Sequence, residues 1–522
     1  MTYRLGIDVG GTNTDAVILS PDAQVIAKVK RPVTEDVVSS IRTAVTDVVA
    51  ASGLDASLVT HAMLGTTQVT NAIIERRRLN RVGLVRIGAP ATLAIPPLTS
   101  WPAELRQAVE RESVVVRGGF EFDGRTIAAL DLDAVAAFVD RVRGEISALA
   151  VSSVFSPVNG EHELAVRDMA ARRWPDLPVS LSHEIGSIGL LERENATVLN
   201  AAVTDVARRA AGAFRDAVAQ AGVRAELFLT QNDGTLMTLD YAMRYPILTV
   251  ACGPTNSMRG ATYLSGVAEA VVIDVGGTST DIGVIRSGFP RESAMAVEVG
   301  GVRTNFRMPD LISLGLGGGS LVTGEGDSVR VGPRSLGYRL VTDGRSFGGP
   351  TLTFTDVANA VGAARIGGRD PGVAPDLARA AYRRAVAMVE EGIDRIKTSA
   401  LDVPLVAVGG GSALLPDRLA GVSEVLRPDN YDVANAIGAA IAQVSGHVDR
   451  VYALEGRRRE DVLDEARALA EAEAVRAGAD PGSIEVVQVE EIPLAYLPGN
   501  ATRVRVVAAG PLGAARLPAD RV

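Results

Sequence analysis

Two segments of the chain carry nearly the same pattern of apolar and polar residues. Leu5–Ile18 reads LGIDVGGTNTDAVI, and Val272–Ile285 reads VIDVGGTSTDIGVI. Each segment is an apolar run, a Gly-Gly turn and a second apolar run, which predicts a β-hairpin. The first aspartates of the two copies, Asp8 and Asp274, are 274 − 8 = 266 residues apart. A repeat of about one domain length predicts a duplicated domain rather than a solenoid.

The residues after the first hairpin predict alternating strands and helices. Residues 25–29 are a candidate third strand, residues 37–50 have the apolar spacing of an amphipathic helix, and residues 59–64 are predicted as a further strand. A helix over 68–76 and a strand over 82–87 follow. A strand hairpin followed by alternating helices and strands is the mixed-sheet α/β layout of a ribonuclease-H-like domain.

The same order returns after the second hairpin, and it suggests three regions. A long helix is predicted over residues 375–398, a strand running into three glycines over 405–412, and a helix of small residues over 433–444. Beyond residue 451, a charged helix precedes two apolar runs. We therefore expect a first half over 1–190, a second half over 191–450, and a small α/β appendage, joined to the second half, over 451–522.

Composition excludes several classes of protein. The 522 residues carry 53 Lys and Arg against 62 Asp and Glu, a formal charge of −9, so we expect no nucleic acid and no membrane as partner. The single cysteine, Cys252, permits no intrachain disulfide. No basic-then-apolar leader follows Met1 and no apolar run of membrane-spanning length is present. We expect a cytoplasmic protein.

Each hairpin turn has the chemistry of a phosphate-binding loop. Glycines let the backbone turn tightly and leave room for a phosphate, and the hydroxyl and amide residues that follow offer donors. An aspartate at the strand end could hold Mg²⁺. An ordinary glycine turn is the alternative, but two matching loops in duplicated halves favour a shared phosphate site. The candidates are Asp8, Gly10, Gly11, Thr12, Asn13 and Thr14 in the first copy, and Asp274, Gly276, Gly277, Thr278, Ser279, Thr280 and Asp281 in the second.

A third glycine run, Gly409, Gly410 and Gly411, follows the apolar strand of the second half. Glycines there permit close approach of a flat group such as adenosine, or simply close packing of a helix. With the two hairpins, it completes the order of loops in actin/hexokinase-like ATPases: phosphate-1, phosphate-2, adenosine. The chain therefore resembles duplicated actin/hexokinase-type domains flanking an ATP cleft.

Four further segments narrow the resemblance. They are residues 61–76 (HAMLGTTQVTNAIIER), 159–163 (NGEHE), 180–184 (SLSHE) and 314–320 (LGLGGGS). Together they resemble the hydantoinase A/oxoprolinase family of ATP-dependent ring-opening amidohydrolases over nearly the whole chain. The resemblance implies ATP and Mg²⁺, a cyclic amide substrate, a B-type hydantoinase partner subunit and an oligomer.

The segment Gly-Thr-Thr…Thr-Asn-Ala is the most specific of these signatures. Thr66 and Thr67 sit at a predicted strand-to-helix junction, where free N–H groups and hydroxyls can bind an anion or a carbonyl. Thr67 may equally be a helix N-cap. Asn71, one turn later, is a further candidate for substrate contact.

Two departures from the family pattern concern the substrate. Larger members usually have His where this chain has Ser313, and residues 336–347 lack a family Gly-Pro-Ala-Cys-Tyr-Gly-like motif. The substrate can therefore differ from hydantoin or 5-oxoproline. Three other functions stay open: the ATPase subunit of a ketone carboxylase, a small-molecule kinase with Asp281 or Glu298 as base, and an actin-like ATP switch without a small-molecule substrate.

Overall fold

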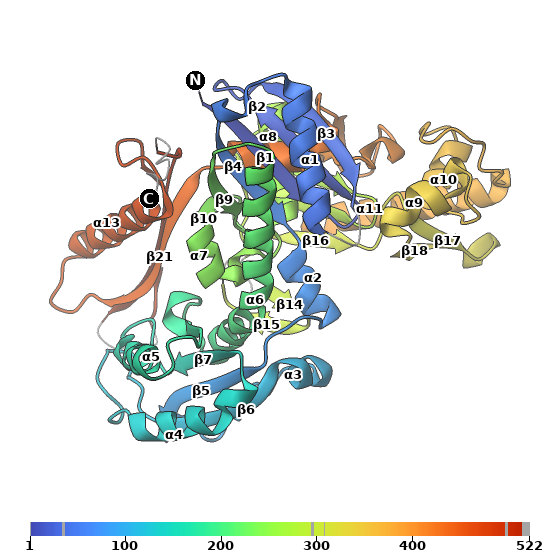
Figure 1. Ribbon diagram of the computed structural model, residues 1–522. Helices are drawn as coiled ribbons and strands as arrows, with labels where there is room; N and C mark the ends of the chain where they lie inside the picture. Colours follow the sequence, from blue (N-terminus) through green and yellow to red (C-terminus); the bar gives the residue numbers. More distant parts are fainter. Residues whose placement is uncertain (1, 34–36, 294–296, 307, 496–499, 514–522) are drawn as a thin grey trace.

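The computed structural model describes residues 2–33, 37–293, 297–306, 308–495 and 500–513 (Figure 1). Two sheets with the same topology form its centre. The strands of the first are β1 (Tyr3–Val9), β2 (Asn13–Leu19), β3 (Val25–Pro32), β4 (Val59–Thr66) and β9 (Glu226–Thr230), in the order β3-β2-β1-β4-β9. The first three are antiparallel neighbours, whereas β4 and β9 run parallel to β1.

The second sheet repeats this arrangement. Its strands are β11 (Ala270–Val275), β12 (Thr280–Arg286), β13 (Phe289–Pro290), β19 (Val403–Val408) and β20 (Val422–Leu426), in the order β13-β12-β11-β19-β20. Strand β16 (Leu311–Leu314) also pairs with β12. Asp8 opposes Asp15 in the first hairpin, and Asp274 opposes Asp281 in the second. The predicted duplication of ribonuclease-H-like domains is confirmed.

Helices cover both sheets and join them. The first sheet packs against α1 (Val37–Ser52) and α6 (Leu190–Gln220), and the second against α11 (Pro375–Ile396). Between the halves, α8 (Cys252–Ser265) lies against α12 (Ala434–Ile441), and α12 also contacts β1, β2 and β4. A β-carbon on Gly438 would lie 1.8 Å from the Asn256 carbonyl oxygen, so glycine permits this close crossing.

A separate four-stranded sheet is inserted after α2 (Gln68–Glu75). It contains β5 (Val82–Ala89), β6 (Glu110–Arg117), β7 (Ala148–Ser153) and β8 (Val179–Leu181), all parallel, in the order β6-β5-β7-β8. Helices α3 (Ala103–Val109), α4 (Leu132–Val142) and α5 (Glu161–Arg173) accompany it at the lower end of the molecule in Figure 1. The strand predicted over 82–87 is therefore β5 of this inserted sheet, and it is not part of the first ribonuclease-H-like sheet.

The C-terminal strands differ from the expectation. Strands β21 (Val444–Ala453), β22 (Glu485–Pro493) and β23 (Ala501–Gly510) extend the first sheet through β10 (Leu236–Thr238), which pairs with β9. They do not join the sheet of the second half. Because α6, β9 and β10 also belong with the first sheet, the sheets divide the chain at other points than residues 190 and 450.

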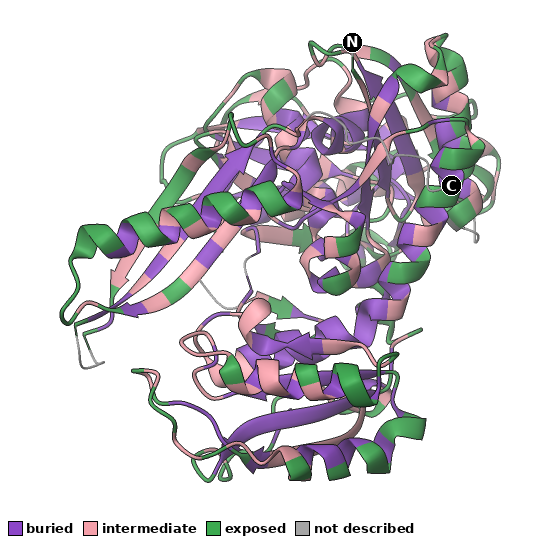
Figure 2. Cartoon of the chain, turned by 60° about the vertical axis from the view of Figure 1, so that its left-hand side comes forward, coloured by how far each residue is buried: buried purple, intermediate pink, exposed green. Residues whose placement is uncertain are grey.

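Amphipathic packing explains the C-terminal arm. Helix α13 (Arg459–Ala477) buries Val462, Ala466 and Ala470 against β21 and β23, while its outer side is exposed (Figure 2).

Among the described residues, no helix is long and apolar enough to cross a membrane. The remaining described elements are α7 (Leu239–Arg244), β14 (Val297–Val299), β15 (Val302–Thr304), β17 (Ser320–Thr323), β18 (Arg330–Ser335), α9 (Leu340–Asp343) and α10 (Phe354–Ala360).

Candidate active site

The two glycine hairpins face one another between the halves. Each turn closes by the same backbone bond: Gly10 N–H donates to the Asn13 carbonyl at 3.0 Å, and Gly276 N–H to the Ser279 carbonyl at 2.9 Å. At their tips, the hydroxyls of Thr12 and Thr278 lie 3.1 Å apart. The duplicated motifs are thus brought together at one place, as the sequence predicted.

A cavity of about 320 Å³ lies between these hairpins. Thr67 and the glycine run Gly409–Gly411 also line it. The predicted hairpin residues on its wall are Asp8, Gly10, Gly11, Thr12, Asn13, Asp274, Gly276, Gly277, Thr278, Ser279 and Asp281.

Four predicted site residues do not line the cavity. Side chains alternate along a strand, so Thr14 and Thr280 turn inward and are fully buried, and Thr280 donates to the Leu316 carbonyl at 2.6 Å. The Thr66 hydroxyl is buried and accepts a bond from the Gln68 N–H. Asn71 is exposed and its amide donates to the Thr67 hydroxyl at 3.4 Å.

Thr67 occupies the N-cap position of α2 without making a side-chain capping bond. Its hydroxyl donates instead to the Val9 carbonyl at 3.3 Å. Thr67 is therefore the N-cap residue of α2 by position, but its hydroxyl does not cap the helix by a hydrogen bond.

Two glycines make room for the strand-end aspartates. Asp8 on β1 opposes Gly65 on β4, where a β-carbon would lie 2.3 Å from the Asp8 Oδ1. On the second sheet, Asp274 opposes Val408, and a β-carbon on the next residue, Gly409, would lie 2.1 Å from the Asp274 Oδ1. Gly65, from the Gly-Thr-Thr segment, therefore gives Asp8 the space that the first glycine of the third loop gives Asp274. Its packing role was not visible from the sequence.

Buried carboxylates line the floor of the cavity. Burial, with the neighbouring charge of Asp15, raises the pKa of Asp8 to about 7. Burial also raises the pKa of Asp281 to about 6 and that of Asp274 above its usual range. Because the ionised forms are destabilised by burial and by one another, this cavity favours a bound cation.

Neutral donors from the two joining helices hold these carboxylates. From α12, the Asn435 amide donates to Asp8 and to Asp15, each at 3.0 Å. From α8, the Ser257 hydroxyl donates to Asp274 at 2.5 Å, and the Asn256 amide lies 3.4 Å from Asp8. None of Asn256, Ser257 and Asn435 is among the site residues predicted from the sequence.

The donor set suits magnesium more than a transition metal. Among the described residues, no three His, Cys, Asp or Glu side chains are grouped to hold a metal ion. Mg²⁺ is usually held by one or two carboxylates together with substrate phosphates and water. Asp8 and Asp274, buried with raised pKa values beside the two loops, fit that mode.

Comparison with known proteins assigns the family. The family model for the hydantoinase/oxoprolinase N-terminal region matches residues 4–174, and the hydantoinase/oxoprolinase model matches residues 193–370. The chain belongs to the hydantoinase/oxoprolinase family. The resemblance inferred from the motifs is thereby confirmed.

Two curated relatives carry names of different activities. The caprolactamase subunit alpha of Pseudomonas jessenii is 28% identical over 391 residues, which are 69% of this chain and 54% of the relative. The acetophenone carboxylase gamma subunit of Aromatoleum aromaticum is 28% identical over 392 residues, 68% of this chain and 52% of the relative. The chain thus spans about half the length of these relatives.

Solved structures share the fold. The crystal structure of the ATP-dependent caprolactamase from Pseudomonas jessenii has a TM-score of 0.77 at 21% identity, covering 99% of this chain and 89% of that one. The nucleotide-free structure of acetone carboxylase has a TM-score of 0.68 at 16% identity, covering 98% and 88%.

Both departures from the hydantoinase/oxoprolinase pattern fall at the cavity. Ser313 on β16 donates a short hydrogen bond to Asp281, its cross-strand neighbour. Within residues 336–347, Leu340, Val341 and Phe347 line the cavity, joined by Ile366. These side chains form an apolar wall beside the third glycine loop, which sequence reasoning did not foresee.

Cys252 is not arranged as a nucleophile. It is 1% exposed, its thiol lies 3.4 Å from the Thr66 carbonyl, and burial raises its pKa to about 11. A thiol held in its protonated form is a poor nucleophile. Cys252 is therefore a buried small residue of the core.

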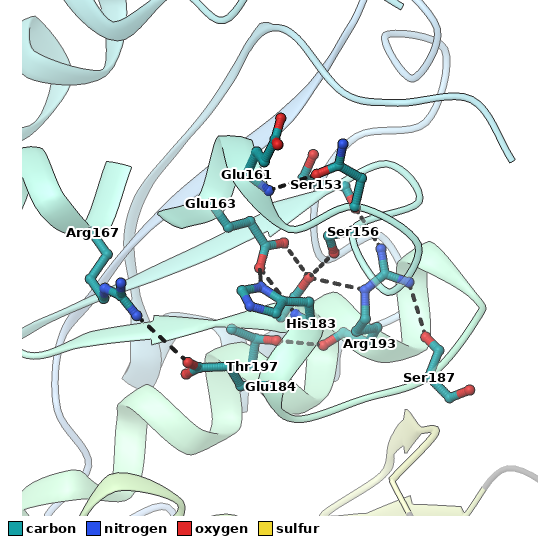
Figure 3. Close-up of polar contacts among 12 residues, drawn as sticks. Ser153, Ser156, Glu161, Glu163, Arg167, His183, Glu184, Ser187, Arg193 and Thr197 are labelled. Atoms are coloured by element: carbon teal, nitrogen blue, oxygen red, sulfur yellow. Dashed lines mark hydrogen bonds and ion pairs between the residues drawn. The ribbon is translucent and has the colours of Figure 1, made fainter. Parts of the chain in front are cut away.

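Two other family motifs meet in the inserted sheet, away from the cavity (Figure 3). Glu163 on α5 is fully buried and accepts bonds from the Ser182 hydroxyl at 2.6 Å and from the His183 ring at 2.7 Å. Arg193 at the start of α6 donates to Ser182 at 2.9 Å. These contacts keep the pKa of Glu163 low despite burial, and they tie the inserted sheet to α6.

Proposed function

We propose that this protein is an ATP-dependent hydrolase subunit. It phosphorylates a cyclic amide or imide, of hydantoin, oxoproline or lactam type, and so drives opening of the ring. The observation that carries the proposal is the pair of matched glycine hairpins that face each other across one cavity, with the buried Asp8 behind one and the partly buried Asp274 behind the other. Membership in the hydantoinase/oxoprolinase family supports the choice of reaction.

The cavity is lined by two chemically different kinds of group, as a nucleotide requires. Backbone N–H groups and hydroxyls of the two hairpins can hold the β- and γ-phosphates. Gly409–Gly411 and the apolar side chains of Leu340, Val341 and Phe347 also line the cavity, and we assign the adenosine to them. Polar loops together with apolar side chains suit ATP more than a simple sugar or a free phosphate.

Phosphorylation solves the chemical problem of opening an unstrained amide ring. The amide oxygen attacks the γ-phosphorus as ADP leaves, giving an O-phosphorylated imidate. Water then adds to the activated carbon, and the C–N bond breaks as the nitrogen takes up a proton, which leaves an acyl phosphate. A second water hydrolyses the acyl phosphate to the carboxylate and free phosphate. Such transfers need positioning and charge neutralisation more than covalent catalysis by the protein. Here the hairpins position the phosphates, and Mg²⁺ at Asp8 or Asp274 would neutralise their charge.

A partner subunit would complete the reaction. The relatives are named as alpha and gamma subunits, and this chain spans about half their length. We therefore propose that a B-type hydantoinase subunit accepts the activated intermediate. Carboxylation of a ketone is the second candidate, because the acetophenone carboxylase subunit is as similar as the caprolactamase subunit. Both reactions begin by phosphorylating a carbonyl oxygen.

Phosphate release from ATP tests the proposal directly. The purified chain, alone and with its candidate partner subunit, is incubated with Mg²⁺, ATP and a panel of lactams, hydantoins and ketones. Stimulation by a lactam or hydantoin, with ring-opened product, supports amidohydrolysis. Stimulation by a ketone only when bicarbonate is present supports the carboxylase. If no compound stimulates release, with or without the partner, the enzyme proposal fails.

A further inference from the structure

Lys30 on β3 is a basic side chain of the cavity that none of the family motifs contains. It is the cross-strand neighbour of Asp15, and its ammonium lies 2.6 and 2.8 Å from the two carboxylate oxygens. The Asp15 side chain is 4% exposed, whereas that of Lys30 is 30% exposed and lines the cavity. An ammonium has three N–H donors, so two serve Asp15 and one is left for a ligand.

The Lys30 side chain reaches from the first half toward the second. A β-carbon on Gly410, in the third glycine loop, would lie 4.0 Å from both the Nζ and the Cε of Lys30. Its charge also acts on Asp274, where it partly offsets the rise in that carboxyl's pKa. The ammonium thus lies among the first hairpin, the second hairpin's aspartate and the adenosine loop.

The charges around the cavity are strongly unbalanced. Among the described residues that line it, Lys30 is the single Lys, Arg or His. Five carboxylates face it. They belong to Asp8, Asp15, Asp274, Asp281 and Asp432. A triphosphate entering this cavity needs positive charge from the protein as well as from a metal ion, because like charges repel strongly at reduced dielectric.

The duplicated half shows that the fold does not require a lysine at this position. Asp281 is the counterpart of Asp15, and its cross-strand neighbour on β16 is Ser313, which satisfies it with a hydroxyl. A hydroxyl is therefore enough to bond Asp281. The need to neutralise Asp15 does not by itself explain why a lysine is present at position 30. The two halves differ here by one full charge.

We propose that Lys30 binds the phosphate chain of the nucleotide, and that Asp15 holds its ammonium in place. This inference rests on the proposed function, because it requires a nucleotide in the cavity. The two halves then have different roles. The first half supplies a fixed positive charge to the phosphates, whereas in the second half Asp281 has no lysine partner and can contact the substrate that is phosphorylated. Lys30 is a binding residue of the same site.

Affinities for ATP and adenosine, measured by titration calorimetry with Mg²⁺, test the assignment. We expect Lys30→Met to weaken ATP binding about 10- to 100-fold, the range of one hydrogen bond to a charged group, and to leave adenosine binding unchanged. Arg31→Met is the matched control, because Arg31 is the next residue on the same strand, pairs with Asp47 at 2.7 Å, and neither of these two residues lines the cavity. It should change neither affinity more than about twofold, which is about 0.4 kcal/mol.

Removing Asp15 separates binding from a purely structural role. Lys30→Met alone leaves a buried carboxylate without its partner, so the chain can lose affinity by misfolding. In Lys30→Met with Asp15→Asn, that charge is gone. If Lys30 binds phosphate, the double variant still binds ATP 10- to 100-fold more weakly than Asp15→Asn. If ATP affinity returns to that of Asp15→Asn, the assignment is overturned.

The same titrations distinguish failure of the inference from failure of the proposed function. A wild-type chain that binds neither ATP nor adenosine refutes the nucleotide site itself, and Lys30 with it. A wild-type chain that binds ATP, with the double variant binding it as tightly as Asp15→Asn, refutes only the role of Lys30.

Discussion

Replacing Asp8 by Asn should stabilise the empty protein at neutral pH while abolishing ATP turnover. The Asp8 carboxylate is buried among other carboxylates, and its charged form is favourable only when a cation is present. Two amides, from Asn256 and Asn435, surround it. In Asp8→Asn, the new side chain can keep its oxygen toward the Asn435 amide, which donates to Asp8 at 3.0 Å in the wild type. The substitution therefore removes a buried charge and keeps the shorter of these two contacts.

The size of the effect follows from the pKa. Asp8 has a pKa of about 7 in place of its ordinary 3.8, a difference of about 3 units. At 1.36 kcal/mol per unit, ionising it in the folded protein costs at most about 4 kcal/mol at pH 8. Because the folded form holds the proton more tightly, stability falls as pH rises from about 4 to 7. The cost is absent below about pH 4 and complete above about pH 7.

Urea unfolding of wild type and Asp8→Asn between pH 4.5 and 8.5, without Mg²⁺ or nucleotide, measures this cost. The stability advantage of Asp8→Asn should grow with pH and level off above about pH 7. Asp55→Asn is the control, because hydrogen bonds from Ser57 lower the pKa of the exposed Asp55 below its ordinary 3.8. Asp55 is therefore ionised in both the folded and the unfolded protein over this pH range, and its effect on stability should not change with pH. A difference between Asp8→Asn and wild type that stays constant over this pH range would refute the electrostatic reasoning.

Two further substitutions test the geometry of the cleft. Gly65→Ala places a β-carbon 2.3 Å from the Asp8 Oδ1. We therefore expect it to lower the free energy of unfolding by about 1–3 kcal/mol and to abolish Mg-ATP turnover, as measured by urea unfolding and phosphate release. Gly144→Ala is the control, because nothing lies within 4 Å of a β-carbon there, and it should change neither quantity. Ser313→Lys should give Asp281 the ion pair that Asp15 has in the other half. We expect it to keep ATP affinity and to reduce substrate-stimulated phosphate release at least tenfold, and unchanged release would count against a role for Asp281.

The hairpins were predictable because their pattern is local. An apolar run, two glycines and a second apolar run specify a turn wherever they occur, and the 266-residue repeat showed that the halves are equivalent. Strand order then followed, because equivalent segments adopt equivalent sheets. The facing of Thr12 and Thr278 at 3.1 Å is a consequence of that duplication.

Helix α6 was not predicted, for a physical reason. It is a 31-residue helix that buries polar as well as apolar side chains, including Arg193, Glu194 and Asn200. Arg86 and Glu194 form an ion pair in which both side chains are 0% exposed. Residues 193–204 of this helix are all buried, so this part has no solvent-facing polar stripe and lacks the 3.6-residue period that identifies a surface helix. Only the three-dimensional partners explain these residues.

The residues that define the chemistry of the cleft were hidden for a related reason. Asn256, Asn435 and Lys30 lie 248, 427 and 15 residues from the aspartates that they bond. No local motif contains these pairs, whereas their positions follow from which helix crosses which sheet. Comparison of the two duplicated halves then gives information that neither half gives alone. Comparing Lys30 with Ser313, two cross-strand neighbours of equivalent aspartates, shows that one half carries a fixed positive charge and the other does not. This difference in charge therefore distinguishes a phosphate-binding side of the cleft from a reacting side, whereas the repeated glycines are common to both sides.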